Sequence, residues 1–171
     1  GSSIQDAWNS WKQVAPVYGM EGQYYTMVYV PDGGAFKWGT YEEDWRGFGK
    51  ITVDDQAEAG VSNNDDDNIV LAKGGWYALL FEGVISADKK AINYTLHIYP
   101  GKAYVIGNAF GNWDEANEAL AMQAPADNSG EWVSPACTAS GELRAYIHFP
   151  GLEWWRTEFS LYNGNLYFRK D

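Results

Sequence analysis

The sequence predicts an all-β protein built from tandem antiparallel β-sandwich modules, of an immunoglobulin-like kind. Two observations lead to this prediction. The chain contains short runs rich in β-branched and aromatic residues, and Gly, Pro, Asn or Asp separates them, as in strands joined by turns. Helical periodicity is weak, because only residues 4–14 and 113–122 have a pattern that allows a turn or two of helix.

The expected strands lie at residues 22–30, 75–84, 91–99, 102–108, 141–149 and 164–169. Neighbouring side chains of a strand point to opposite faces of a sheet, so each run can place its apolar residues against a core. Turn-forming residues stand between the runs. This arrangement favours a sandwich of antiparallel sheets.

The two halves of the chain share a loose repeat. Trp8 opens the first matching stretch and Trp113 opens the second. Trp45 and Trp155 stand near the ends of these stretches, at similar spacings from the opening tryptophans. A repeat of this kind is typical of a duplicated structural unit.

The repeat predicts two β-sandwich modules, residues 1–99 and 100–171, with a boundary near Pro100. The first half continues into two further strand runs, whereas the second ends at Asp171, where their counterparts are due. This leaves two alternatives open for the second module: it is truncated at its C-terminus, or the native protein continues. Two alternatives are also open for the first module: its first strand is present in this sequence, or it is missing.

The charge of the chain restricts its partners. Its 171 residues carry a formal net charge of −11. Nucleic acids and anionic membranes are bound by basic surfaces, so we expect neither of them as the main partner. A neutral ligand fits this charge better.

Cysteine content and hydropathy restrict the class further. Cys137 is the single cysteine, so no internal disulfide can form. No run approaches the ~20 apolar residues of a membrane-spanning helix. The opening residues Gly1–Ser3 resemble the remnant of a tag, so we expect a native N-terminus with any lipidation signal to lie outside this sequence.

Aromatic side chains are abundant, with 9 Trp and 12 Tyr. Trp154 and Trp155 are adjacent, and if they lie in a strand, one enters the core while the other faces solvent. An exposed indole offers a flat apolar face to the C–H groups of a sugar ring, while the sugar hydroxyls need charged or amide partners. Other tryptophans lie inside strand runs, and we expect core packing for Trp38, Trp76 and Trp132.

Several segments of the chain together resemble one known family. They are "MVYVPDGGAFKWG" (27–39), "DNIVLAKGGWYALLFEG" (67–83), "AYVIGNAFGNWD" (103–114) and "GELRAYIHFPGLEWWRTEF" (141–159). These segments resemble the SusE/SusF family, surface lipoproteins of the starch-utilisation systems of Bacteroidota. The resemblance implies a non-catalytic, modular protein with carbohydrate-binding-module-like β-sandwiches, anchored on the extracellular face of the outer membrane. Its modules are expected to bind α-glucan through paired aromatic rings and a basic side chain.

Carried onto the second module, the resemblance implies a glycan-binding site of three residues. Trp113 comes from the "NWD" turn and Trp155 from "EWW". Arg169 supplies the basic partner in the strand that follows. A structural alternative for Arg169 is an ion pair on the sheet face.

Carried onto the first module, the resemblance implies Trp8 and Trp45 as the paired rings. Asp66 or Asn68 stands where the basic partner is expected, so this module departs from the family pattern. Core packing is the alternative for both tryptophans.

Metal, cofactor and catalytic sites are not expected. The acidic stretch 63–68 lacks the glycine and glutamate that an EF-hand loop needs at its sixth and twelfth positions. His97 and His148 lie in separate strand runs without neighbouring ligands. Residues 42–44 are acidic, but nothing in the sequence places a pair of carboxylates across a cleft, as a glycosidase requires.

The leading functional prediction is a non-catalytic cell-surface module that binds a starch-like polysaccharide through aromatic platforms. Its partners are then the glycan and other proteins of an outer-membrane glycan-uptake system. The alternative is a structural spacer module of a surface lipoprotein with no ligand of its own. A glycosidase is the third and weakest hypothesis, since it needs two carboxylates facing one cleft.

Overall fold

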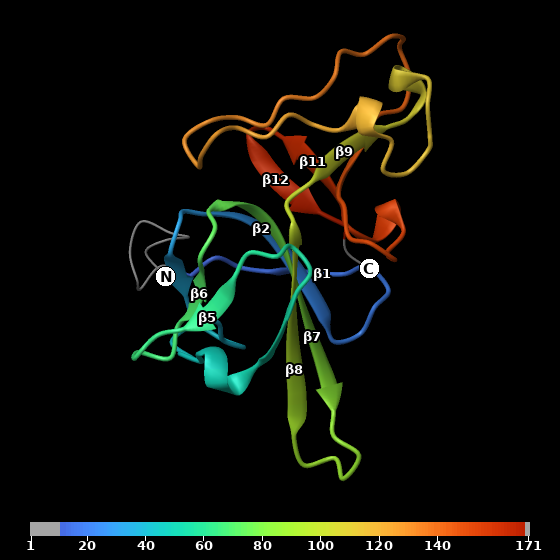
Figure 1. Cartoon of the computed structure of the whole chain (residues 1–171). Coiled ribbons are helices and arrows are strands. Elements are labelled where there is room, and N and C mark those ends of the chain that lie inside the picture. Colours follow the sequence, from blue (N-terminus) through green and yellow to red (C-terminus); the bar gives the residue numbers. More distant parts are fainter. Residues whose placement is uncertain (1–10, 170–171) are drawn as a thin grey trace.

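A computed structural model describes residues 11–169, and this part of the chain is all-β (Figure 1). Its only helical segments are short 3₁₀ turns. The strands are β1 (Ala15–Pro16), β2 (Gln23–Val30), β3 (Gly34–Phe36), β4 (Thr52–Asp55), β5 (Val61–Asn63), β6 (Ile69–Leu71), β7 (Gly75–Ile85), β8 (Ile92–Pro100), β9 (Ala103–Ile106), β10 (Arg144–Ile147), β11 (Glu158–Tyr162) and β12 (Asn165–Phe168). The predicted all-β class is confirmed.

The largest sheet has five strands in the order β1-β2-β7-β8-β4. The long hairpin of β7 and β8 forms its centre and extends beyond the rest of the molecule (Figure 1). All neighbours in this sheet are antiparallel except β4, which runs parallel to β8. The expected runs at 22–30, 75–84 and 91–99 thus pair with one another as β2, β7 and β8.

Both faces of the five-stranded sheet are covered, as β2 illustrates. Val28 and Val30 belong to one cluster of buried side chains. Tyr25 belongs to a second cluster, against which Met27 packs. Because the side chains of a strand alternate between faces, these two clusters lie on opposite sides of the sheet. The sheet is therefore a middle layer.

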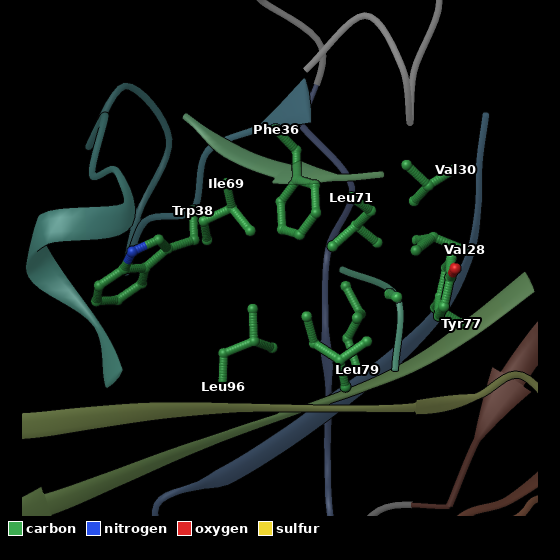
Figure 2. Close-up of a cluster of buried hydrophobic side chains, with 11 residues drawn as sticks. Val28, Val30, Phe36, Trp38, Ile69, Leu71, Tyr77, Leu79 and Leu96 are labelled. Carbon is green, nitrogen blue, oxygen red and sulfur yellow. The ribbon is translucent and has the colours of Figure 1, made fainter. Parts of the chain in front are cut away.

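The first cluster fills the space between this sheet and a three-stranded sheet in the order β3-β6-β5 (Figure 2). Phe36, Ile69 and Leu71 point inward from the smaller sheet, and Leu79 and Leu96 meet them from the larger one. All five side chains are buried. This sandwich is formed wholly by residues of the first half.

The second cluster joins the two halves of the chain. Tyr25, Ala78 and Leu80 line the outer face of the five-stranded sheet, and Ile147 and Phe149 of the second half pack against them. Buried apolar side chains from both sides of residue 100 therefore share one cluster. The division into units 1–99 and 100–171 stays a prediction.

The second half contains a four-stranded sheet in the order β12-β11-β10-β9 and a third buried cluster of its own. The long connection from β9 to β10 carries the 3₁₀ turns η2 (Asn108–Phe110) and η3 (Glu118–Leu120). Another 3₁₀ turn, η4 (Trp154–Arg156), stands between β10 and β11. The turn η2 shortly precedes Trp113, and η4 contains Trp154 and Trp155.

Candidate functional site

The first half presents a pair of indoles at its surface. The Trp45 side chain is 43% exposed, although indole is strongly apolar. Its ring centroid lies 4.6 Å from that of Trp11, with 48° between the ring planes. We call Trp11 and Trp45 the first indole surface. Trp8, the partner predicted from sequence, lies outside the described residues.

The loop that carries Trp45 is stabilised by its own neighbours. Asp44 accepts hydrogen bonds from the backbone N–H of Thr40 (2.8 Å) and from its hydroxyl (2.9 Å). Arg46 Nε donates to Asp44 Oδ1 at 3.0 Å. The Arg46 guanidinium lies 5.2 Å from the Trp38 ring centroid and 5.5 Å from that of Tyr94. The hydrogen bond from Thr40, followed by the contact with Arg46, holds the pKa of the Asp44 carboxyl below its usual value.

A groove of about 730 Å³ adjoins the first indole surface. Polar side chains also line it, including those of Lys37, Thr40 and Glu42. Lys37 Nζ donates to the backbone carbonyl of Asp66 at 2.7 Å, so the acidic stretch lies beside this basic side chain. A groove of this size with a few polar groups among apolar ones is typical of small-ligand sites.

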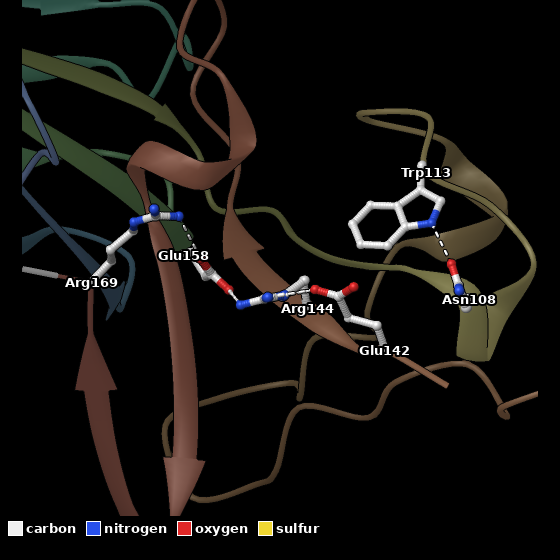
Figure 3. A network of polar contacts seen from close by, with 6 residues as sticks. All are labelled: Asn108, Trp113, Glu142, Arg144, Glu158 and Arg169. Carbon is white, nitrogen blue, oxygen red and sulfur yellow. Dashed lines mark hydrogen bonds and ion pairs between the residues drawn. The ribbon is translucent and has the colours of Figure 1, made fainter. Parts of the chain in front are cut away.

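The second half presents another pair of indoles. The Trp113 side chain is 41% exposed, and its Nε1 donates to Asn108 Oδ1 at 2.7 Å (Figure 3). The Trp113 and Trp154 ring centroids are 6.0 Å apart, with 50° between the planes. Trp154 also packs against Tyr146, 6.4 Å away. We call Trp113 and Trp154 the second indole surface.

Trp155 takes a different direction from Trp154. Its ring meets that of Tyr18 edge-on at 5.6 Å, and the Arg156 guanidinium lies 4.3 Å from its centroid. The two tryptophans belong to the 3₁₀ turn η4, whose side chains are separated by about 120° instead of the 180° of a strand. Both are therefore half-buried, which differs from the expectation of one buried and one exposed ring.

Arg169 belongs to a row of alternating charges in the second half (Figure 3). Its Nη1 lies 3.1 Å from Glu158 Oε2, and Arg144 Nη1 lies 2.7 Å from Glu158 Oε1. Arg144 also pairs with Glu142. The Arg169 guanidinium lies 4.4 Å from the Tyr18 ring centroid and 5.8 Å from that of Trp155. The structure thus places Arg169 beside Trp155, two of the residues predicted to act together. The third, Trp113, lies beside Trp154 instead.

The spacing of the paired rings decides how each surface can meet a ligand. A flat group between two parallel rings needs about 7–8 Å between them, since each contact takes roughly 3.5–4.0 Å. The observed centroid distances of 4.6 and 6.0 Å are too short for that. Each pair therefore forms one continuous, bent apolar surface that is open to contact from outside and not between the rings.

Potential metal ligands were compared over residues 11–169, the part of the chain that the structure describes. No group of three or more His, Cys, Asp or Glu side chains in it is arranged to hold a metal ion. A search of the same residues finds no helix long and apolar enough to cross a membrane.

Comparison with known proteins now identifies the family. The family model described as SusF/SusE starch-specific carbohydrate-binding modules matches residues 1–93 and 102–171. The chain belongs to this family. Carbohydrate-binding modules of this kind are non-catalytic, which confirms the prediction that the chain is not an enzyme.

A similar sequence supports the assignment to the SusF/SusE family, and a similar solved structure shows the fold. Outer membrane protein SusF of Bacteroides thetaiotaomicron is 26% identical over 168 residues, which is 94% of this chain and 33% of that protein. The crystal structure of SusF from Bacteroides thetaiotaomicron matches with a TM-score of 0.73 at 21% identity, covering 94% of this chain and 36% of that one. At this identity the structural match shows a shared fold. The chain spans about a third of the length of these relatives.

The two indole surfaces contain four rings, and two of them, Trp11 and Trp154, were not selected from the sequence. Both lie close in sequence to a predicted residue, since Trp11 follows Trp8 by three positions and Trp154 precedes Trp155. The available signal was the clustering of tryptophans in "WNSWK" and "EWWR". Which member of each cluster reaches its partner depends on the local turn, and the pattern of residue types does not encode it.

Proposed function

We propose that this chain binds a starch-like polysaccharide through the first and second indole surfaces, without catalysing a reaction on it. The observation that carries the proposal is the repetition: each half exposes one indole by more than 40% and sets a second indole beside it. An exposed indole adds little to folding, but its face suits the C–H surface of a pyranose ring. The family of starch-specific modules to which the chain belongs supports the choice of ligand class.

The angle between the rings supports a curved glycan. The planes are inclined by 48° in the first indole surface and by 50° in the second. Two successive sugar rings of a chain that bends can each lie flat on one indole of such a pair. A straight, flat chain meets only one of the two indole faces. An α-linked glucan, which coils, fits this geometry.

The polar groups beside the indoles fit the edges of sugar rings. Lys37, Thr40 and Glu42 lie in the groove beside the first indole surface. In the second half Asn108 is hydrogen-bonded to Trp113 and retains its amide N–H groups as donors. In this proposal Trp155 and Arg169 support the protein framework, because their side chains are engaged with Tyr18 and Glu158.

We further propose that the chain acts at the extracellular face of the outer membrane, as part of a longer lipid-anchored protein. The support is the similarity to a relative named as an outer membrane protein, of which this chain spans about a third. Other proteins of a glycan-uptake system are the expected partners at that place. A spacer module without a ligand is the alternative that the following experiment addresses.

Affinity electrophoresis in gels containing starch, pullulan or dextran tests the proposal. The parent chain is expected to be retarded by starch and pullulan, and Trp45→Ala combined with Trp113→Ala is expected to abolish the retardation. Each lost ring should weaken binding by about 1–3 kcal/mol, by analogy with base–aromatic stacking. Tyr162→Ala is the matched control, because this residue is an aromatic one, 66% exposed at the end of β11, and belongs to neither indole surface.

The outcomes separate the two hypotheses. Equal retardation of the double variant and the parent would refute the indole surfaces as the site. A parent chain that no polysaccharide retards would favour the spacer module. Thermal melting of each variant confirms that it is folded.

A further inference from the structure

The turn between β1 and β2 contacts η4, although the two segments lie at opposite ends of the chain. Tyr18 N–H donates to the carbonyl of Arg156 at 3.0 Å. Arg156 Nη1 donates in return to the carbonyl of Tyr18 at 2.9 Å. One backbone hydrogen bond and one from the Arg156 side chain therefore join the backbone of the first-half turn to η4.

The Tyr18 side chain adds a second layer of contacts. Its ring lies 4.4 Å from the Arg169 guanidinium and meets the Trp155 ring edge-on at 5.6 Å. Arg169 is itself held by Glu158 at 3.1 Å. A guanidinium over an aromatic face and an edge-on aromatic pair are both attractive arrangements. The ring of Tyr18 thus links η4 to β11 and to the end of β12.

Apolar packing and a glycine complete this contact. Val17 and Met20, on either side of the turn, belong to the same apolar cluster as Leu152, which precedes η4. Gly19 adopts a left-handed φ of 67°, and a Cβ at this position would lie 3.2 Å from Arg156 Nη1. A side chain at this position would therefore strain the backbone and press on Arg156, so the close approach of the turn favours glycine.

The same 3₁₀ turn carries Trp154. Within the second half Trp154 packs on Tyr146, and the Thr157 hydroxyl donates to the carbonyl of Ile147 at 2.6 Å. These contacts hold η4 from one side, and the Tyr18 contacts hold it from the other. The position of Trp154 beside Trp113 therefore depends on both halves of the chain.

We infer that Tyr18 is a positioning residue of the second indole surface, so that the first half completes the glycan-binding site of the second. This inference rests on the proposed function. Loss of the Tyr18 ring removes its contacts with Trp155 and Arg169, while the hydrogen bonds between the Tyr18 backbone and Arg156 remain. The turn η4 is then held less firmly, and in a fraction of the molecules Trp154 no longer adjoins Trp113. The apparent affinity then falls in proportion to the fraction of molecules that keep the binding arrangement.

Calorimetric titration with maltoheptaose tests this inference in variants in which one of the two indole surfaces has been inactivated. In a Trp45→Ala background, where the second surface remains, Tyr18→Ala is expected to weaken binding about three- to tenfold. Tyr18→Phe keeps the ring and should restore the affinity. In a Trp113→Ala background, where the first surface remains, Tyr18→Ala should leave the affinity unchanged.

The two backgrounds distinguish positioning from a general loss of stability. A merely structural role of Tyr18 would lower the melting temperature and affect both surfaces alike or neither. Unchanged affinity of Tyr18→Ala in the Trp45→Ala background would overturn the inference and leave the proposed function intact. Tryptophan variants that bind like the parent would overturn both. Tyr18→Leu keeps apolar bulk without an aromatic face and carries the same expectation if Tyr18→Ala does not fold.

Discussion

The two indole surfaces have similar ring geometry and different means of support. The loop of Trp45 is stabilised by residues close to it in sequence, chiefly the pair Asp44 and Arg46, which lie two positions apart. The turn of Trp154 is stabilised by Arg156 and its contact with Tyr18, which lie 138 positions apart. One surface is thus locally supported, and the other depends on contacts between the two halves.

This difference has consequences for how each surface responds to change. A local hydrogen-bond network survives as long as its own loop is ordered, whatever happens elsewhere. A surface supported from another part of the chain is lost when that contact opens. We therefore expect substitutions at the contact between the halves to affect the second indole surface and to spare the first.

The largest expected effect comes from the buried cluster that joins the halves. Phe149 is 1% exposed, and Phe149→Ala should lower the free energy of unfolding by about 3–5 kcal/mol. Phe36, buried to a similar extent in the first-half sandwich, is the matched control. Because the cluster is shared, calorimetry should show a single melting transition for the parent and both variants. Two transitions, only one of which moves in Phe149→Ala, would instead show that the halves unfold independently.

A smaller effect is expected at Glu158, whose side chain is 12% exposed between two arginines. Glu158→Gln removes the charge that Arg144 and Arg169 share, and should cost about 2–3 kcal/mol of unfolding free energy. Urea denaturation measures this. Arg144 and Arg169 are themselves partly exposed, so solvent screens part of the loss. Stability equal to that of the parent would mean that the row of charges contributes nothing to the fold.

Different consequences are expected for the neighbouring tryptophans. Trp154→Ala should weaken glycan binding at the second surface about tenfold, because it removes one ring of that surface. Trp155→Ala should lower the free energy of unfolding by about 1–2 kcal/mol, through the lost contacts with Tyr18 and Arg156, and should weaken binding less than Trp154→Ala does, because it loosens η4 without removing a ring of the surface. Binding titrations and thermal melts of both variants separate these effects. If Trp155→Ala reduced affinity more than Trp154→Ala, the sequence-based choice of Trp155 would be the better one.

The smallest effect concerns pH and the first surface. The pKa of the Asp44 carboxyl is lower in the folded than in the unfolded chain, so the ionised carboxylate stabilises the fold. This stabilisation is fully present above the unfolded pKa of about 3.9 and is lost as the pH falls through the folded pKa. The stability difference between the parent and Asp44→Asn should be under about 1 kcal/mol at neutral pH and should shrink below pH ~4. Denaturation of both proteins between neutral and acid pH checks this. A difference that grows on acidification would contradict the assigned direction.

The strands of the middle sheet were predictable from sequence because one physical signal specifies them. The runs at 22–30, 75–84 and 91–99 combine β-branched and aromatic residues with turn residues at their ends, and the structure places β2, β7 and β8 there. The position of this sheet as a middle layer, covered on one face by the first half and on the other by the second half, was not predictable. It depends on which distant segments cover each face, and both faces of β2 are simply apolar.

Part of the arrangement of rings was predictable. Trp45 and Trp113 were selected as glycan-binding rings, and both are exposed, by 43% and 41%. Their role in binding stays a prediction. The choice of Trp155 over Trp154 came from the family resemblance, and the expectation of one buried and one exposed ring assumed a strand. The structure instead has Pro150 and Gly151, with φ 85° at the glycine, leading into a 3₁₀ turn. The pairing of Trp11 with Trp45 joins two loops, and no local pattern of residue types encodes such a contact.

The central claim is that each chain carries two separate glycan-binding surfaces, each formed by a pair of indoles. Calorimetric determination of stoichiometry with maltoheptaose tests it most directly. The account predicts two molecules bound per parent chain, one per chain for either Trp45→Ala or Trp113→Ala, and none for the double variant. Undiminished stoichiometry in both single variants, or any saturable binding by a folded double variant, would contradict it.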